Sequence, residues 1–305
     1  SVAIGVIGII YESRPNVTID AACLSLRSGN VSILRGGSEC IETNKKLYEC
    51  IQEALKDYQF DTYLVCFIQN TDRSFVEELL KAEGDIDVII PRGGKSLIET
   101  ISQNSRVPTI KHLEGLCHTF WDIGYDKEKA AEVVANAKLR RPEICGATET
   151  LLIHSGNSAE DISHVLDNLR SQGCEIIGCT RLQEMYSIDR AATEDDWSTE
   201  YLDKKITVKI VDNVEESVEH INKYSSGHTE SCLSDNQESI KYFFQNCKSA
   251  ILMNNASTQF ADGGEFGFGA EIGISTDKLH VRGPVGAKHL TTFKYQVTGN
   301  HTTRP

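Results

Sequence analysis

Several features that mark whole classes of protein are absent from this 305-residue sequence. No uninterrupted apolar run approaches the roughly 20 residues that a membrane-spanning helix needs, so no such segment is predicted. The ten cysteines form no Cys-x-x-Cys pair and no secretory signal precedes them, which predicts reduced cytoplasmic thiols and no metal site. Positive charge is scarce: 31 Lys and Arg face 44 Asp and Glu, and the net charge of −13 argues against a nucleic-acid partner.

Two further patterns restrict the expected sites. The acidic residues between positions 189 and 203 are typical of a solvated surface loop rather than of a metal site. The sequence also lacks a Gly-x-Gly-x-x-Gly motif, so any dinucleotide binding is not of the usual Rossmann type.

Short apolar runs and segments of helical spacing alternate along the chain. A strand, a turn, a helix and another strand form a βαβ unit, which predicts an α/β fold with parallel sheets. The length is sufficient for two domains, each with its own core. The expected strands include residues 2–10, 31–34, 62–69, 86–90, 174–179, 206–211 and 250–253, and the expected helices 18–26, 41–56, 73–83, 127–138, 161–171, 214–223 and 237–244.

Two Gly-Gly turns follow predicted strands and precede predicted helices. They are Arg35-Gly36-Gly37 and Arg92-Gly93-Gly94. A Gly-rich turn at a helix N-terminus is where α/β folds hold phosphate, so the pair indicates an anion or dinucleotide site, whereas either turn alone could be a mere connector. Residues 262–273 carry five glycines, which predicts a tightly folded loop near a ligand or another backbone.

Cys145 stands in a short turn of Gly and Ala, preceded by Arg140 and Arg141 and followed by an apolar run. A thiol beside cations and backbone amides has a reason to ionise, and the thiolate is a nucleophile. The alternative is a buried structural cysteine. Residue chemistry alone leaves both interpretations open.

The two ends of the chain also carry expectations. The sequence starts at Ser1 and enters a strand at once, which suggests that an N-terminal segment is missing. Residues 290–297 alternate in polarity and predict a terminal strand with an exposed edge that another subunit would cover.

Six segments together resemble the γ-glutamyl phosphate reductase family of the aldehyde dehydrogenase superfamily, which also forms the reductase half of bifunctional pyrroline-5-carboxylate synthase. The match runs essentially from Gly5 to the end. It implies an aldehyde-dehydrogenase-like fold with a cofactor-binding domain at 1–118, a catalytic domain at 119–283 and an oligomerisation strand in 284–305. The matching segments are residues 5–17, 33–39, 90–94, 145–152, 255–258 and 266–284.

The resemblance implies NADPH-dependent reduction of L-glutamate 5-phosphate to L-glutamate 5-semialdehyde in proline biosynthesis. Cys145 falls on the family's nucleophile and would form a thioester as phosphate leaves. Asn16 falls where the superfamily places an amide donor to the oxyanion, although a turn former after Pro15 is an equal alternative.

The resemblance also implies the residues that contact the cofactor. Local charge alone suggests the cations for the substrate's carboxylate and phosphate. The cofactor contacts would be Arg35, Glu39, Arg92, Gly93, Gly94, Glu265 and Phe266, and the substrate cations Lys138, Arg141 and Arg282.

Two residues depart from the simplest form of this interpretation. Gly146 stands where the family usually has Asn, and Glu114 lies near the general base of hydrolytic aldehyde dehydrogenases. The alternatives are therefore a hydrolytic NAD(P)-dependent aldehyde dehydrogenase and a truncated, non-catalytic fragment. Further expectations are a homo-oligomer, a fused or associated glutamate 5-kinase, and a cytoplasmic location, or a mitochondrial one for a eukaryotic bifunctional synthase.

Overall fold

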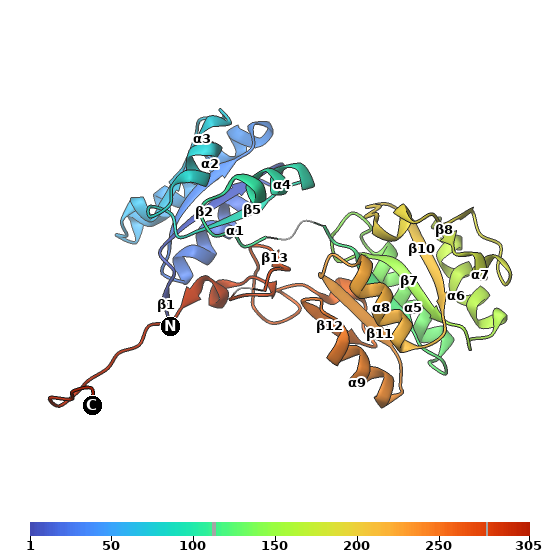
Figure 1. The fold of residues 1–305 in the computed structure, drawn as a ribbon. Helices are drawn as coiled ribbons and strands as arrows, with labels where there is room; N and C mark the ends of the chain where they lie inside the picture. The colour runs from blue at the N-terminus through green and yellow to red at the C-terminus, as the bar shows by residue number, and fades with distance from the viewer. Residues whose placement is uncertain (112–113, 279) are drawn as a thin grey trace. The chain divides into compact units, whose positions relative to one another are not determined.

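The computed structural model describes residues 1–111, 114–278 and 280–305, and these form two compact units (Figure 1). Unit 1 consists of residues 1–110, 268–273 and 285–305, and unit 2 of residues 111–267 and 274–284. The predicted boundary after residue 118 falls inside strand β6 (Cys117–Trp121) of unit 2. Residues 285–305, nearly all of the predicted oligomerisation segment, cluster with unit 1.

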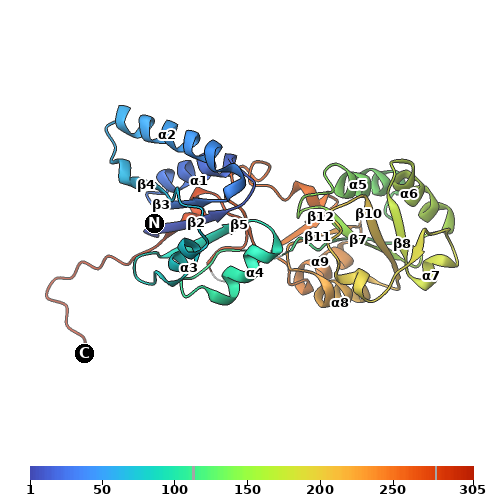
Figure 2. The same ribbon diagram turned by 90° about the horizontal axis from the view of Figure 1, so that it is seen from above.

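A parallel sheet in the order β4-β3-β2-β5 forms the centre of unit 1. Helices α1 and α2 cover one face of this sheet and α3 and α4 the other (Figure 2). Buried aliphatic side chains, among them Ile10, Leu80 and Ile89, fill the layer between the sheet and α3. The elements are β2 (Val6–Tyr11), α1 (Asn16–Arg27), β3 (Val31–Gly36), α2 (Ile41–Asp57), β4 (Val65–Phe67), α3 (Ser74–Lys81), β5 (Val88–Arg92) and α4 (Lys95–Asn104).

The C-terminal strand is much shorter than predicted. Only β15 (Thr291–Thr292) forms, and it pairs antiparallel with β1 (Val2–Ala3) of the same chain. In the described structure residues 293–297 belong to no sheet, and Phe293 and Tyr295 are 72% and 86% exposed. A segment of alternating polarity forms a strand only when it pairs with a neighbouring strand. Within the described chain, only the residues of β15 have such a partner.

A second parallel sheet, in the order β12-β11-β6-β7-β10-β8-β9, forms the centre of unit 2. Helices α5 and α6 cover one face and α8 and α9 the other (Figure 2). This is the α/β arrangement that the alternating pattern predicted. After β6 the elements are α5 (Lys127–Leu139), β7 (Thr148–His154), α6 (Ala159–Ser171), β8 (Glu175–Gly178), α7 (Thr180–Gln183), β9 (Arg190–Ala191), β10 (Lys205–Val211), α8 (Val214–Tyr224), β11 (Thr229–Leu233), α9 (Gln237–Asn246), β12 (Ile251–Asn254), β13 (Ile274–Ser275) and β14 (Gly283–Pro284).

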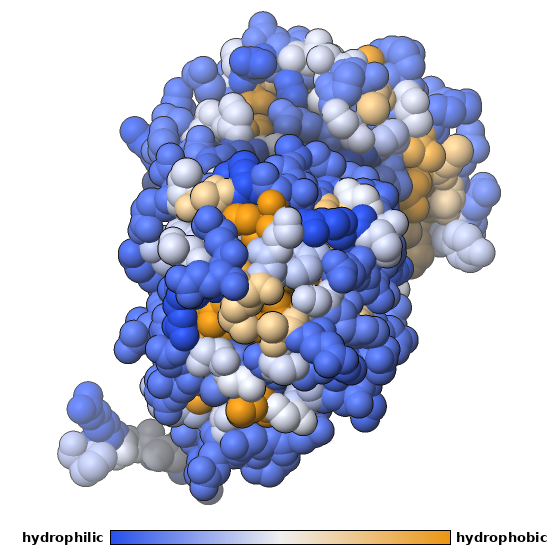
Figure 3. Space-filling view, turned by 90° about the vertical axis from the view of Figure 1, so that its right-hand side faces the viewer, coloured by the Kyte–Doolittle hydropathy of each residue, from blue (hydrophilic) through white to orange (hydrophobic). Residues whose placement is uncertain are grey.

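The surface of unit 2 is mainly polar on the side where α6 and α7 lie. Hydrophilic residues dominate this view, and hydrophobic ones form small separate groups (Figure 3). Among the described residues no helix combines the length and apolar character needed to cross a bilayer.

Candidate active site

Cys145 occupies the second position of a β-turn between α5 and β7. The turn is closed by the amide of Ala147, which donates to the carbonyl of Ile144 at 2.9 Å. The Cys145 side chain is half-buried. Within the described residues neither the Cys145 amide nor the Gly146 amide donates a hydrogen bond. The turn therefore offers N–H groups for developing negative charge beside a reachable thiol.

The two carbonyl groups of this turn are held by side chains from other segments. The thiol of Cys117 donates to the carbonyl of Cys145 at 3.1 Å. The hydroxyl of Thr258 donates to the carbonyl of Gly146 at 2.7 Å. The backbone orientation of the turn is thus fixed from two sides.

Gly115 packs directly against the backbone of Cys145. A Cβ atom at Gly115 would lie 2.0 Å from the carbonyl oxygen and 2.3 Å from the Cα of Cys145. Only glycine allows this approach without a backbone shift. By contrast, a Cβ at Gly146 would lie 3.5 Å or more from every described atom beyond its neighbours in the chain. Packing therefore does not require glycine at this position in place of the Asn that is usual in the family.

Lys138, a predicted substrate ligand, is fully buried near the end of α5. Its Nζ donates to Glu149 Oε2 at 2.5 Å. Burial raises the pKa of Glu149 to about 7, while the charge of Lys138 opposes that rise. The ammonium group faces a carboxylate rather than solvent, so this placement gives no support to a direct substrate contact.

The two other predicted substrate cations lie in unit 2 with Cys145. Arg141 is exposed four residues before it. Arg282 is half-buried; its Nη2 donates to the carbonyl of Lys248 at 2.8 Å, and within the described part of the chain its Nε has no hydrogen-bond partner. Both arginines therefore retain donors for an anionic substrate.

Asn16 is exposed at the first residue of α1 in unit 1, where its Nδ2 donates to Asp20 Oδ2 at 3.0 Å. This contact is an i,i+4 side-chain pair on the first turn of the helix, which is compatible with the alternative role as a turn residue. The predicted oxyanion role remains a prediction.

Two carboxylates bind backbone amides at the carboxyl ends of β2, β3 and β5. Glu39 accepts from the amide and the hydroxyl of Ser13 at 2.5 and 3.0 Å. Its pKa is lowered mainly by backbone hydrogen bonds, from its own amide and that of Ser13. Glu12 accepts from the amide of Gly94 at 3.2 Å, and a Cβ at Gly93 would lie 2.5 Å from this carboxylate. The Gly-Gly turns thus lie beside two carboxylates that accept hydrogen bonds, as well as beside the cation that was predicted to bind the cofactor.

Arg35 is 8% exposed, and its Nη2 donates to the carbonyl of Thr71 at 2.8 Å. Its Nε has no hydrogen-bond partner among the described residues. Burial lowers the pKa of Arg35; Glu39 opposes this effect and the charge of Arg73 adds to it. Arg73 is an exposed cation just before α3 that the sequence reasoning missed. The available signal was its position after a strand, at the same sheet edge as the Gly-Gly turns.

Glu265 and Phe266 belong to unit 2 and lie in the glycine-rich loop. The Asp262 carboxylate accepts from the amides of Gly264 and Glu265 at 2.7 and 3.3 Å, which folds the loop tightly as predicted. Glu265 is exposed, whereas Phe266 is partly buried and packs against the cluster that contains Ile251. Their roles at the nicotinamide remain predictions.

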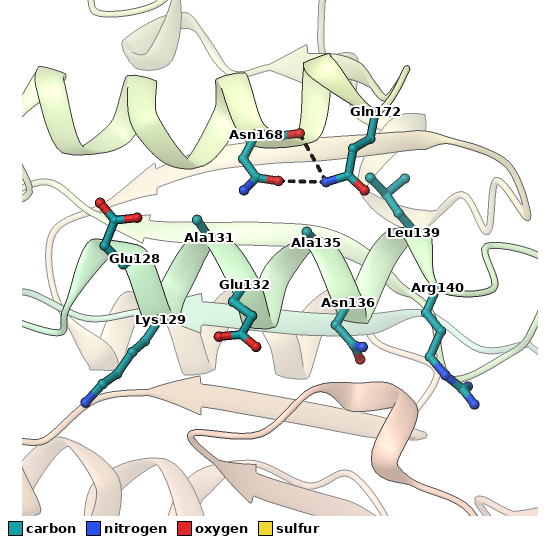
Figure 4. Close-up of a pocket in the computed structure, with 10 residues that line it drawn as sticks. All are labelled: Glu128, Lys129, Ala131, Glu132, Ala135, Asn136, Leu139, Arg140, Asn168 and Gln172. Atoms are coloured by element: carbon teal, nitrogen blue, oxygen red, sulfur yellow. Dashed lines mark hydrogen bonds between the residues drawn. The ribbon is translucent and has the colours of Figure 1, made fainter.

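A groove between α5 and α6 is open to solvent (Figure 4). The side chains of Ala131 and Ala135 form its floor, and Gln172 Nε2 donates to Asn168 Oδ1 at 2.7 Å along one wall. None of the predicted site residues lines this groove. It carries no nucleophile and is not the candidate site.

No family model matches the chain, but individual proteins do. γ-Glutamyl phosphate reductase from Zymomonas mobilis subsp. mobilis is 51% identical over 304 residues, which are 100% of this chain and 71% of that protein. The enzyme of the same name from Thermotoga sp. (strain RQ2) is 48% identical over 99% of this chain and 73% of that protein. The chain belongs to the γ-glutamyl phosphate reductase family.

Solved structures agree with this assignment. The crystal structure of γ-glutamyl phosphate reductase from Thermotoga maritima matches with a TM-score of 0.97 and 47% identity, covering 99% of this chain and 73% of that chain. An acetylating aldehyde dehydrogenase from Geobacillus thermoglucosidasius, 17% identical, matches with a TM-score of 0.75 over 98% of this chain and 76% of its own, which shows a shared fold. The predicted γ-glutamyl phosphate reductase family, the oxidoreductase class and the aldehyde-dehydrogenase-like α/β fold are confirmed.

Proposed function

We propose that this chain reduces L-glutamate 5-phosphate to L-glutamate 5-semialdehyde with NADPH and releases phosphate, a step of proline biosynthesis. Relatives with about half of their residues identical are named γ-glutamyl phosphate reductase, which supports the reaction. The structural observation that carries it is the half-buried Cys145, held in a turn whose amides are available to an anion.

Chemically, the Cys145 thiolate attacks the carbonyl carbon of the acyl phosphate. A carbon–sulfur bond forms, the bond from that carbon to the phosphate oxygen breaks, and phosphate leaves with the electron pair. NADPH, when bound, supplies a hydride to the thioester carbon. The hemithioacetal then loses the thiolate, which yields the aldehyde and restores Cys145. Amide donors at the turn would stabilise the oxyanions by about 3 kcal/mol each, and the oxyanion role of Asn16 stays a prediction.

The residues at the carboxyl ends of the unit 1 strands fit a dinucleotide phosphate. No described residue accepts a hydrogen bond from the buried Arg35 Nε, and the exposed Arg73 adds a second positive charge nearby. These two cations suit the 2′-phosphate of NADPH, and the Glu39 carboxylate suits ribose hydroxyls. A Cβ at Gly94 would meet no atom within 4 Å, which leaves room for a pyrophosphate beside the α4 N-terminus.

For the substrate, we propose Arg141 and Arg282 as the cations that bind its carboxylate and phosphate. Arg141 is exposed and near Cys145 in sequence, and the Arg282 Nε has no acceptor among the residues that the structure describes. Arginine can bind either anion with two parallel hydrogen bonds. Lys138 would act only indirectly, through its ion pair with Glu149.

The predicted partners remain part of the proposal. The exposed tail with Phe293, Tyr295 and Val297 supports a homo-oligomer, because a second subunit would cover this apolar surface. A fused or associated glutamate 5-kinase would supply the acyl phosphate. The cytoplasmic location, and the mitochondrial alternative, stay predictions.

The reverse reaction tests the chemistry. Pyrroline-5-carboxylate, which is in equilibrium with the semialdehyde, should reduce NADP only when inorganic phosphate is added, because phosphate must cleave the thioester. Cys145→Ala should abolish this turnover and retain NADPH binding. Equal activity without phosphate would instead favour a hydrolytic aldehyde dehydrogenase with Glu114 as base. No NADPH binding by the purified chain would favour the non-catalytic fragment.

A further inference from the structure

Three fully buried threonines form a continuous chain of hydroxyl contacts that ends at the Cys145 turn. Thr119 on β6 lies 2.8 Å from Thr148 on β7, oxygen to oxygen. Thr148 lies 2.9 Å from Thr258, which donates to the carbonyl of Gly146 at 2.7 Å. All three side chains have zero exposure, so no solvent competes for these bonds.

The number of hydroxyl protons fixes which group donates and which accepts in every hydrogen bond of this chain of threonines. A hydroxyl group has a single proton to donate. Thr258 donates its proton to the carbonyl of Gly146, so it must accept from Thr148. Thr148 has then used its own proton and must accept from Thr119. The hydroxyls therefore all point towards the turn, and each bond polarises the next.

The receiving carbonyl belongs to the peptide group that closes the turn around Cys145. The same Gly146–Ala147 peptide carries the amide of Ala147, which donates to the carbonyl of Ile144. A donor on the carbonyl side strengthens the amide as a donor on the other side. The threonine chain thus orients the closing peptide, and with it the Cys145 backbone.

We propose that Thr258 is a positioning residue for Cys145, with Thr148 and Thr119 supplying the aligned protons behind it. This inference rests on the proposed function, since it requires Cys145 to be the nucleophile. Without the Thr258 hydroxyl, the carbonyl of Gly146 and the proton of Thr148 both lose their partner. The turn then rotates to find other partners, and the thiol leaves its reacting position.

A second threonine pair in the same sheet provides a matched control. Thr150 lies 2.7 Å from Thr207, which donates to the carbonyl of Glu149 at 2.9 Å. Both side chains are as buried as those of the first chain. This pair has the same chemistry but ends on a strand carbonyl rather than on the turn.

The test compares Thr258→Val, Thr258→Ser and Thr207→Val in the phosphate-dependent reverse assay, with thermal unfolding measured in parallel. For Thr258→Val we expect kcat to fall on the order of 10-fold to 100-fold, as for a displaced reacting group. KM should stay within about twofold, because substrate contacts are intact. Thr258→Ser should recover most of kcat. Thr207→Val, which removes the same kind of hydroxyl-to-carbonyl bond, should lower the unfolding temperature to a similar extent and keep kcat.

An unchanged kcat in folded Thr258→Val would overturn the proposal, as would equal losses of kcat in Thr258→Val and Thr207→Val. If Thr258→Val does not fold, Thr148→Val tests the same chain, because it removes the donor to Thr258 and leaves the bond to Gly146. An unchanged kcat there would also overturn it. Failure of the proposed function has a different signature: wild type and Cys145→Ala would then have equal activity.

Discussion

The Nζ atom of Lys138 lies 2.5 Å from a carboxylate oxygen of Glu149, and both side chains are shielded from solvent. Lys138 lies near the end of α5 and Glu149 near the start of β7. The ion pair therefore ties together the two ends of the segment that carries Cys145. Gln259 adds to this closure, because its Nε2 donates to the carbonyls of Ala137 and Arg141 at 3.0 and 3.3 Å.

Replacing Lys138 by Met should destabilise the protein by about 3–5 kcal/mol, since it leaves a buried carboxylate without its partner. The double variant Lys138→Met/Glu149→Leu should regain more than half of this loss, because neither charge is then buried alone. Urea unfolding at pH 8 measures both. Equal stability of the single and double variants would show that the ion pair is not the source of the effect.

Gly115→Ala should destabilise the protein by about 1–3 kcal/mol, as is usual for overpacking. It should also reduce turnover, because the new methyl group would displace the backbone of Cys145. Gly146→Ala, in the Cys145 turn itself, is the matched control, since its Cβ would meet only ordinary contacts. Thermal unfolding and kcat are the readouts. A Gly115→Ala variant as stable and active as Gly146→Ala would refute the required close approach.

Arg35→Ala and Arg73→Ala should each raise the dissociation constant for NADPH roughly tenfold and leave that for NADH nearly unchanged, because only NADPH carries the 2′-phosphate. Fluorescence titration with both cofactors measures the ratio. The control variant is Lys46→Ala, which removes a cation on α2 whose side chain is 75% exposed. It should change neither dissociation constant. Equal loss of NADH affinity in the arginine variants would contradict recognition of the 2′-phosphate.

His220 should make the fold sensitive to acid. Burial lowers the pKa of His220 to about 2, and the neighbouring His118, Lys209 and Lys223 add to the effect. In the unfolded chain His220 binds a proton near pH 6.5, whereas in the folded chain it stays neutral at that pH. Stability contributed by neutral His220 is therefore present above pH 6.5 and is lost as the pH falls below it, by at most about 1.4 kcal/mol per pH unit.

The variant His220→Phe should flatten this dependence. Its unfolding free energy, measured by urea at intervals between pH 8 and 4.5, should fall less steeply below pH 6.5 than that of the wild type. The remaining slope reports other groups, such as His228, whose pKa burial lowers to about 4. Parallel profiles for the two proteins would show that protonation of His220 does not lower the unfolding free energy.

The sequence pattern predicted elements whose apolar residues face a core, and missed those held by polar contacts. Strand β11 was not predicted, because it carries Glu230 and Ser231 in place of an apolar run. Glu230 is nevertheless fully buried, since it accepts from the amide of His118 and the hydroxyl of Ser249, both at 2.7 Å. A partner 112 residues away in sequence leaves no local signal.

The same limit applies to charged residues. The acidic stretch at 189–203 was predicted to be a solvated loop, yet Asp196 is only 6% exposed and binds Arg190 and Tyr201. Lys138 was interpreted from local charge as a substrate ligand, and its buried partner Glu149 could not be seen in the pattern. Charge identifies a residue's chemistry, but only tertiary contacts decide whether that charge faces a ligand or another residue.

The pairing of β1 with β15 has a consequence for synthesis of the chain on the ribosome. Val2 pairs with Thr292, so a strand that is synthesised early must wait for one that is synthesised much later. Residues 111–267 of unit 2 are continuous and emerge well before that point. Because domains generally fold as units during synthesis, the half that carries Cys145 should be able to fold while the other half still lacks its closing strand.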